Sequence, residues 1–228
     1  MKRAFLGLAA LSLTLSPALA RDRAPSGAYA NPSAVIAAEI AFAKLAQEKG
    51  QWTAFRATAT KDAVMFEPEM ILAGVWLRDK ADPAKAVAWQ PHQVWSSCDG
   101  SLAVTRGAWQ ADGGVSGYFT TVWQRQKDGK YRWIADQGEP LPMPLDAPDM
   151  IVAKVADCPA GYRGKAPKKG KVAPTPFDPA HRSGASDDGT LTWDVAVAPD
   201  HSRRFVITMA SGGQPVTVQD LQIEAPGK

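Results

Sequence analysis

The sequence predicts an α+β fold in which N-terminal helices pack on an antiparallel sheet and a three-stranded β segment follows at the C-terminus. Apolar side chains recur at helical spacing between residues 35 and 45. Asp-Gly turn signals then separate segments rich in Trp, Val, Thr and Tyr, which is typical of an antiparallel meander. Three more strand-like segments close the chain at 191–198, 204–210 and 216–223.

The first helix has a start signal and a stop signal. Ser33 or Asn31 can cap it, and Pro32 suits a first helical position. Gly50 fits the position that follows a helix C-terminus. A second, shorter helix is predicted over 51–60, where Trp and Phe recur on one side.

The central segment reads as strands and turns. Short apolar runs at 63–66 and 70–73 flank Glu67-Pro68-Glu69, and residues 75–80 can form one or two helical turns. Turn signals at Asp99-Gly100, at Asp112 to Gly114 and at Asp128-Gly129 imply four longer strands. These strands are expected near 89–98, 102–111, 115–126 and 130–138.

The Asp128-Gly129 hairpin predicts its own register. A turn of two residues places Asp136 opposite Thr121 and Ile134 opposite Trp123. Phe119, Thr121, Trp123, Ile134 and Asp136 then share one face of the sheet. On the other face we expect Tyr118, Val122 and Trp133. The hairpin therefore places one carboxyl group among aromatic and aliphatic side chains.

The segment after Gly138 is rich in Pro. A brief helix is expected over 149–156, and residues 159–189, rich in Pro, Gly and Lys, read as a linker to the β segment at 190–228. The turn at 188–191 (DGTL) weakly echoes the turn at 99–102 (DGSL). A three-stranded unit is rarely stable alone, so we expect it to pack on the first domain.

The N-terminus reads as a signal peptide over residues 1–20, followed by a flexible arm over 21–32. Lys2 and Arg3 precede a short apolar run, and Ala18-Leu19-Ala20 forms a cleavage signature. A membrane anchor is the alternative, but a spanning helix needs about 20 apolar residues. We therefore expect an exported, periplasmic or secreted protein with no membrane insertion after cleavage.

The charge of the mature chain gives little reason to expect nucleic acid as a partner. Cleavage removes two of the 26 Lys and Arg and none of the 23 Asp and Glu, which leaves a net charge of +1. In an oxidising compartment Cys98 and Cys158 are expected to form a disulfide. By the chain-entropy estimate, closing this loop would stabilise the folded state by about 4 kcal/mol. Two unpaired thiols are the alternative.

Several segments resemble the nuclear transport factor 2-like superfamily, including its SnoaL-like and uncharacterised exported bacterial branches, over about residues 33–138. The segments are 117–129 (GYFTTVWQRQKDG), 133–138 (WIADQG), 66–68 (FEP), 74–77 (GVWL) and 104–107 (VTRG). The resemblance implies a cone-like fold of helices on a curved sheet over 33–158, with a hydrophobic pocket and often a homodimer built on the sheet. Members range from ketosteroid isomerases and polyketide cyclases to proteins that only bind other proteins, so the fold does not settle the function.

Asp136 is the best catalytic candidate, because burial among apolar side chains raises the pKa of a carboxyl toward that of a base competent near neutral pH. A structural acid that is hydrogen-bonded to Thr121 is the competing interpretation. The expected pocket residues are Phe119, Thr121, Trp123, Ile134, Trp76 and Glu67. His92, on a strand face with Val94 and Ser96, is a weaker candidate.

Two functions remain open at this point. One is an exported protein that binds, and in one version isomerises, cyclises or hydrolyses, a small hydrophobic molecule. The other is a non-catalytic envelope module for dimerisation or protein binding. The sequence holds no nucleotide-binding or hydrolase signature, and neither His nor Cys occurs at metal-ligand spacing. We expect no cofactor and no metal.

Overall fold

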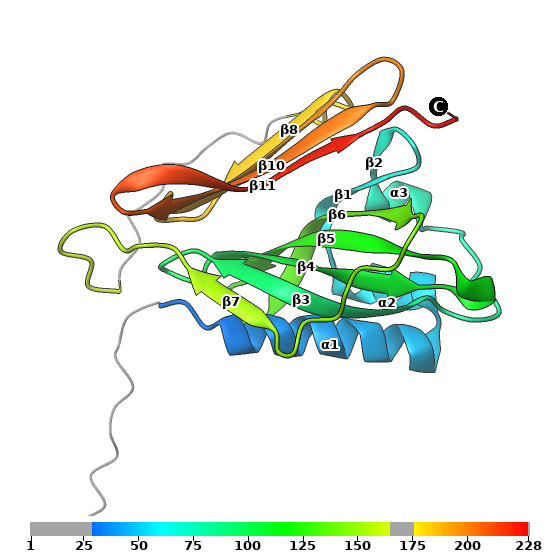
Figure 1. The fold of residues 1–228 in the computed structure, drawn as a ribbon, viewed down its shortest axis with the longest axis horizontal. Helices are drawn as coiled ribbons and strands as arrows, with labels where there is room; N and C mark the ends of the chain where they lie inside the picture. The colour runs from blue at the N-terminus through cyan, green and yellow to red at the C-terminus, as the bar shows by residue number, and fades with distance from the viewer. Residues whose placement is uncertain (1–28, 165–175, 228) are drawn as a thin grey trace, which may run out of the picture.

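The computed structural model describes residues 29–164 and 176–227, which form three layers (Figure 1). Helices α1 (Pro32–Lys49) and α2 (Gln51–Thr58) form the first layer. A seven-stranded sheet forms the second, and a four-stranded sheet crosses its other face as the third. This arrangement confirms the predicted α+β class with an additional C-terminal β segment. The expected signal peptide, 1–20, lies outside the described residues.

Helix α1 begins and ends where its sequence signals predict. The side chain of Asn31 accepts a hydrogen bond from the backbone of Ala34 at 3.1 Å, so Asn31 and not Ser33 is the cap. Gly50 ends the helix with a φ of 105°. A Cβ at Gly50 would lie 2.3 Å from the carboxyl carbon of Asp82, whose Oδ1 accepts from the backbone of Thr53 in α2. Glycine thus allows Asp82 to cap the second helix at close range.

The large sheet has the strand order β2-β1-β6-β5-β4-β3-β7. The sheet is mixed, because β1 pairs in parallel with β6, and β3 pairs in parallel with β7. The meander from β3 to β6 is antiparallel, as expected. The short helix α3 (Ala73–Trp76) follows β2, and the 3-10 turn at Asp112–Gly114 joins β4 to β5. The strands of this sheet are β1 (Ala59–Phe66), β2 (Met70–Leu72), β3 (Ala88–Ser96), β4 (Leu102–Gln110), β5 (Ser116–Arg125), β6 (Tyr131–Leu141) and β7 (Val152–Val155).

The β5–β6 hairpin combines a longer turn with a bulge. Arg125 pairs with Tyr131, so the turn has one more residue than predicted, with Gly129 at a φ of 80°. The register then shifts between Val122 and Trp123. The bulge adds one unpaired residue to β6, which compensates the longer turn. Asp136 therefore lies opposite Thr121 as predicted.

Because of the same bulge, two residues of β6 lie on other faces of the sheet than predicted. Trp133, not Ile134, lies opposite Trp123, and Trp133 is fully buried on the helix side of the sheet. Ile134 is the extra residue, and it packs on the opposite side against the core between the two sheets. The expected placement of Ile134 in the pocket and of Trp133 on the outer face is therefore wrong.

The segment after β6 forms a strand where a brief helix was expected. Residues 152–155 form β7, which pairs in parallel with β3 at the edge of the large sheet. The free edge of β3 supplies backbone hydrogen-bonding partners that the local sequence does not reveal. The strand still delivers Cys158 to Cys98, and the two form the predicted disulfide.

The C-terminal sheet has four strands in the order β11-β10-β9-β8, one more than predicted. The additional strand, β8, lies within the range expected to be a linker, and its sequence HRSGA lacks the apolar alternation that would mark it. Large apolar side chains from both sheets form the core between them, among them Trp95, Leu102, Trp193 and Phe205. The strands are β8 (His181–Ala185), β9 (Leu191–Val197), β10 (Arg203–Ser211) and β11 (Gln214–Ile223).

The two echoing turns are joined to each other. In each turn a serine hydroxyl donates to the aspartate two residues later: Ser97 to Asp99 at 2.7 Å and Ser186 to Asp188 at 2.6 Å. The backbone N–H of Cys98 donates to the hydroxyl of Thr190. The backbone N–H of Asp187 donates in the same way to the hydroxyl of Ser101. This reciprocal pair of bonds, beside the disulfide, fixes one end of the second sheet on the first.

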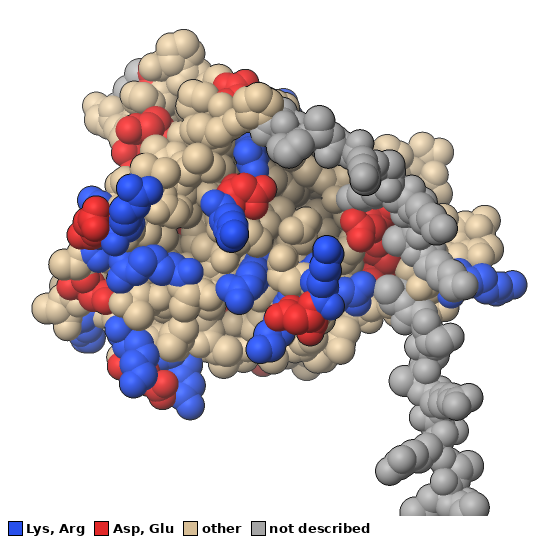
Figure 2. All heavy atoms as spheres, turned by 180° about the vertical axis from the view of Figure 1, so that it is seen from behind, with Lys and Arg blue, Asp and Glu red and all other residues tan. Residues whose placement is uncertain are grey.

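The surface does not carry one dominant charge on the face that Figure 2 shows, where basic and acidic side chains are interspersed. Among the described residues, no helix is long and apolar enough to cross a membrane.

Candidate functional site

A cavity of about 230 Å³ lies between the helices and the large sheet. Its walls come from α1, α2, the end of β1, and strands β3 to β6, so residues far apart in the chain meet there. The lining residues are Phe42, Gln51, Trp52, Phe55, Met65, Phe66, Glu67, Val87, Trp89, Trp109, Phe119, Thr121, Asp136, Gln137 and Gly138. Seven of these fifteen residues are aromatic, so the cavity is small and mainly apolar.

Asp136 places a carboxyl group in this enclosure. Its Oδ2 accepts a hydrogen bond from the hydroxyl of Thr121 at 2.6 Å, across the two strands that the hairpin register brings together. Burial, together with the charge of Glu39, raises the pKa of Asp136 to about 7, although the bond from Thr121 opposes the shift. The carboxyl is therefore divided between its protonated and ionised forms near neutral pH, as a general acid or base requires.

Glu39 is a second buried carboxyl, which the sequence analysis missed. It is fully buried on α1, where its oxygens accept from Trp89 Nε1 at 2.8 Å, Thr105 Oγ1 at 2.5 Å and Trp123 Nε1 at 3.0 Å. Burial raises the pKa of Glu39, and the three hydrogen bonds oppose that shift. Its position on the buried stripe with Val35 was a signal that could have found it, since charged side chains are rarely buried alone.

Glu39 does not line the cavity but lies behind its wall. Thr105 donates to Glu39, and Thr105 lies directly opposite Thr121, which in turn lies opposite Asp136. A polar row thus crosses the three central strands on the helix side. Glu39 accordingly acts on Asp136 through its charge, and Asp136 is the carboxyl group of the row that lines the cavity, beside Thr121.

Glu67 lines the cavity at its border, as expected from its place beside the strand break. Its side chain is more exposed than that of Asp136, and partial burial raises its pKa while Lys80 opposes the shift. Phe119 and Thr121 also line the cavity as predicted.

Two other predicted pocket residues lie elsewhere. Trp123 is buried in the core beneath the helices, where its N–H donates to Glu39 and to Thr105. Trp76 packs edge-on against Trp52, with their ring centroids 5.1 Å apart, and Lys80 covers its ring at 4.1 Å. It contacts a cavity residue without itself lining the cavity. Alternation along the strands does not separate the rings that line the cavity from the rings that fill the core behind it.

His92 lies outside this site. The register of β3 against β4 shifts around it, and its buried Nε2 has no partner within the described residues. Burial lowers its pKa, so it is neutral near pH 7. It borders two separate pockets, both of which Leu145 also lines. Within 29–164 and 176–227, no group of three or more His, Cys, Asp or Glu side chains is placed to hold a metal ion.

Fold and site together define an α+β protein with a cavity between helices and sheet, a lining carboxyl of raised pKa, and a second sheet on the far side. No family model and no curated protein matches the chain. Among solved structures, it is similar to one from Parabacteroides distasonis ATCC 8503 that is described provisionally as a ketosteroid isomerase. The match has 17% sequence identity and a TM-score of 0.40, and covers 50% of this chain and 96% of the other. At these values the likeness establishes neither a family nor an activity.

Proposed function

We propose that this chain is an exported protein of the nuclear transport factor 2-like superfamily that binds a small hydrophobic molecule in the helix-covered cavity. One observation carries the proposal: a carboxyl group with a pKa of about 7 lines a mainly apolar cavity in which seven of the fifteen lining residues are aromatic. Such a group can take a proton from a bound molecule and return it to another atom of the same molecule. The proposed chemistry is therefore general acid-base catalysis of the isomerase, cyclase or hydrolase type, without a cofactor.

The hydrogen bond from Thr121 supports this role for Asp136, because it fixes one carboxyl oxygen and leaves the other for a ligand. The structure gives Oδ2 its partner at 2.6 Å, and no described residue is hydrogen-bonded to Oδ1. A proton can then be exchanged at Oδ1 while Thr121 holds the group in place.

Export is supported by the signal-like N-terminus and by the Cys98–Cys158 disulfide, since disulfides persist in oxidising compartments. A periplasmic extract should contain a chain that begins at Arg21, which intact mass measurement would show. A chain that retains residues 1–20 would contradict export by cleavage.

The homodimer stays a prediction. The C-terminal sheet covers the face of the large sheet that lies away from the helices (Figure 1). A dimer that forms on that face would have to displace it, so a dimer of the intact chain is expected to use another surface.

Native mass spectrometry of the purified protein tests the proposal, because a retained small molecule would add its mass to the mature chain. The wild-type protein is expected to carry a ligand that the Phe119→Ala variant loses, since Phe119 lines the cavity. Ala substitution of Phe177, outside the cavity, is the matched control. Retention by the Phe119 variant as well would contradict the assignment of the site.

Substitution of Asp136 by Asn tests the acid-base role through the pH dependence of stability. A carboxyl whose pKa is raised on folding binds its proton more tightly in the folded state, so stability is greatest below the unfolded value of 3.8 and falls as pH rises to about 7. Asn can still accept from Thr121 and has no charge to bury. The variant is therefore expected to melt at a higher temperature than wild type at pH 8.

The same melts at pH 3.5 give the control, because there the advantage of the Asn variant should disappear. If the stability of the variant still falls as pH rises, that remaining fall is assigned to Glu39, whose pKa is also raised. If Asp136→Asn unfolds the protein at pH 8, Asp136 is a structural acid and the catalytic role fails.

A further inference from the structure

The cavity offers a ligand groups that attract positive charge. Two carboxyl groups line it, from Asp136 and Glu67, and none of the described lining residues is Lys, Arg or His. Aromatic faces carry negative electrostatic potential, which attracts cations that lie over the ring. The aromatic lining residues are Phe42, Trp52, Phe55, Phe66, Trp89, Trp109 and Phe119.

Several donors of the lining are already used inside the protein. The indole N–H of Trp89 donates to Glu39 at 2.8 Å, and that of Trp109 to the backbone oxygen of Tyr118 at 2.9 Å. The hydroxyl of Thr121 donates to Asp136. Gln51, whose Oε1 accepts from the backbone of Val87, keeps its amide N–H groups as donors. Gln137, another lining residue, has a buried Nε2 without a hydrogen-bond partner among the described residues. A ligand therefore meets mainly aromatic side chains and two carboxyl groups, with the amides of Gln51 and Gln137 as donors.

We propose that the ligand of this cavity is a small organic ammonium ion, held over aromatic faces and paired with Asp136. The inference rests on the proposed binding function and adds the charge of the ligand to it. Rings that surround an ammonium group stabilise it without a direct hydrogen bond, which suits quaternary and tertiary amines.

The size of the cavity favours a small ligand. Pockets for drug-sized molecules are typically about 300–1,000 Å³, and this cavity of about 230 Å³ lies below that range. An ammonium group with a single apolar substituent suits a space of this size.

The charged surroundings of Asp136 favour the same class of ligand. Glu39 lies behind it from α1, and its charge raises the pKa of Asp136. Glu67 is the other acid of the cavity, with Lys80, Glu69 and Glu139 acting on it. Arg203 covers Phe66 with its guanidinium 4.6 Å from the ring, but it is paired with Glu139.

A bound cation would therefore stabilise the ionised form of Asp136 and lower its pKa. By linkage, the ligand binds more tightly as pH rises through about 7, where Asp136 loses its proton in the free protein. A neutral ligand of the same shape has no such dependence on ionised Asp136.

Phenyltrimethylammonium and tert-butylbenzene provide the test, because they have the same shape and differ in charge. Binding to the full mature protein can be followed by tryptophan fluorescence, since Trp52, Trp89 and Trp109 line the cavity. At pH 8 the cation is expected to bind at least tenfold more tightly than the neutral isostere. The ratio should shrink severalfold at pH 5.5 and in the Asp136→Asn variant.

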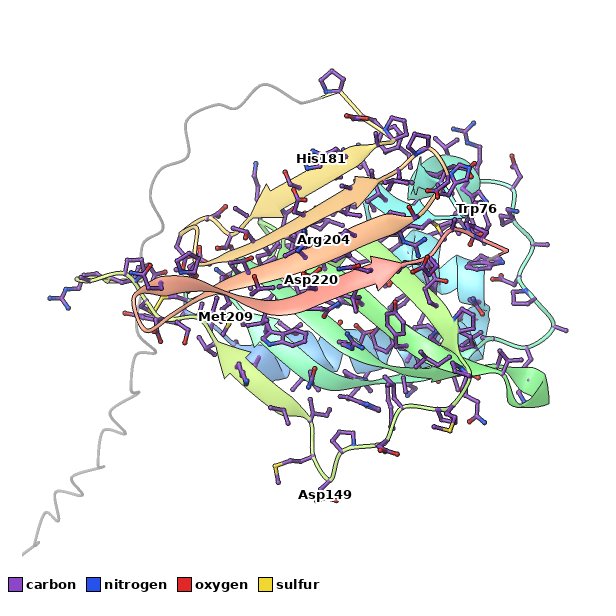
Figure 3. All side chains as sticks on the ribbon, turned by 45° about the horizontal axis from the view of Figure 1, so that its top comes forward. Trp76, Asp149, His181, Arg204, Met209 and Asp220 are labelled. Carbon is purple, nitrogen blue, oxygen red and sulfur yellow. A yellow bond between two sulfur atoms is a disulfide. The ribbon has the colours of Figure 1, made fainter. Side chains whose placement is uncertain are left out.

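A pair of tryptophan variants distinguishes binding to the aromatic lining residues, here called the aromatic cage, from an effect on general packing. Trp52 lines the cavity, whereas Trp76 packs against Trp52 from outside it; Figure 3 shows the position of Trp76 at the edge of the molecule. Trp52→Leu is expected to weaken cation binding at least threefold more than Trp76→Leu. Equal losses in the two variants would contradict a cage at this position.

The outcomes distinguish the two proposals. If the neutral isostere binds as tightly as the cation or more tightly, the binding function stands and the inference about charge is overturned. If neither compound binds and no small molecule is retained through purification, the binding function itself fails.

Discussion

Substitution of Arg203 by Met is expected to lower the free energy of unfolding by about 3 kcal/mol. Arg203 is 7% exposed on β10, between the two sheets, where its guanidinium pairs with Glu139 of β6 and lies over the ring of Phe66. Met keeps much of the apolar volume but leaves Glu139 half-buried without its cation, and breaking a buried pair in this way costs about 3–5 kcal/mol. Because Glu139 is partly exposed, we expect the loss of stability to lie at the lower end of this range.

The neighbouring residue supplies the control. Arg204 points outward from the same strand and makes two hydrogen bonds with Asp220, at 2.8 and 2.6 Å, on the face that Figure 3 shows. Because an exposed ion pair contributes about 0–1 kcal/mol, Arg204→Met should change the free energy of unfolding by less than about 1 kcal/mol. Urea unfolding of both variants makes the comparison. Equal losses would show that Arg203 does not join the sheets.

Substitution of Glu39 by Ala is expected to cost about 3–5 kcal/mol. The change leaves the indole N–H of Trp89 without its acceptor in the core, removes the main acceptor of Thr105, and opens a space beneath α1. Each buried donor that loses its partner costs about 1–3 kcal/mol, and the empty volume adds to this. Urea unfolding at pH 7 measures the loss.

Two further variants define what the Glu39 result means. Glu48→Ala, on the exposed face of the same helix, should cost less than about 1 kcal/mol, since Glu48 makes only an exposed pair with Lys44. Glu39→Gln keeps an acceptor for one of the donors and should recover part of the loss. A loss below 1 kcal/mol for Glu39→Ala would mean that water replaces the carboxylate and that its hydrogen bonds do not organise the core.

The parts of the fold that sequence predicts are those with local causes. The Asn31 cap and Gly50 define α1, and the Asp-Gly turns define the meander. The pairing of Thr121 with Asp136 was also predicted, although the turn is one residue longer than assumed. It holds because a bulge at Ile134 compensates the longer turn.

The parts that the sequence did not reveal depend on distant partners. β7 exists because the edge of β3 is open to it, and β8 exists because β9 pairs with it. Neither strand carries an alternation of apolar residues that would mark it alone. The bulge that moves Ile134 to the other face of the sheet likewise has no signature in the hairpin sequence.

The candidate site was predictable where the strand register determines it. Phe119, Thr121 and Asp136 follow from alternation along two paired strands, and all three line the cavity. Glu39 was missed because its partners, Trp89, Thr105 and Trp123, come from three strands that only the tertiary fold brings to α1. Its place among the apolar residues of the helix was the available signal.

The most direct test of the proposed site is an NMR titration of the Asp136 side-chain carboxyl carbon, assigned by comparison with Asp136→Asn. The carbon signal is expected to titrate with a midpoint of about 7 in the free protein. Saturation of the cavity with phenyltrimethylammonium should move that midpoint downward. A midpoint near the ordinary value of 3.8, unchanged by the ligand, would show a solvated carboxylate and contradict the acid-base site.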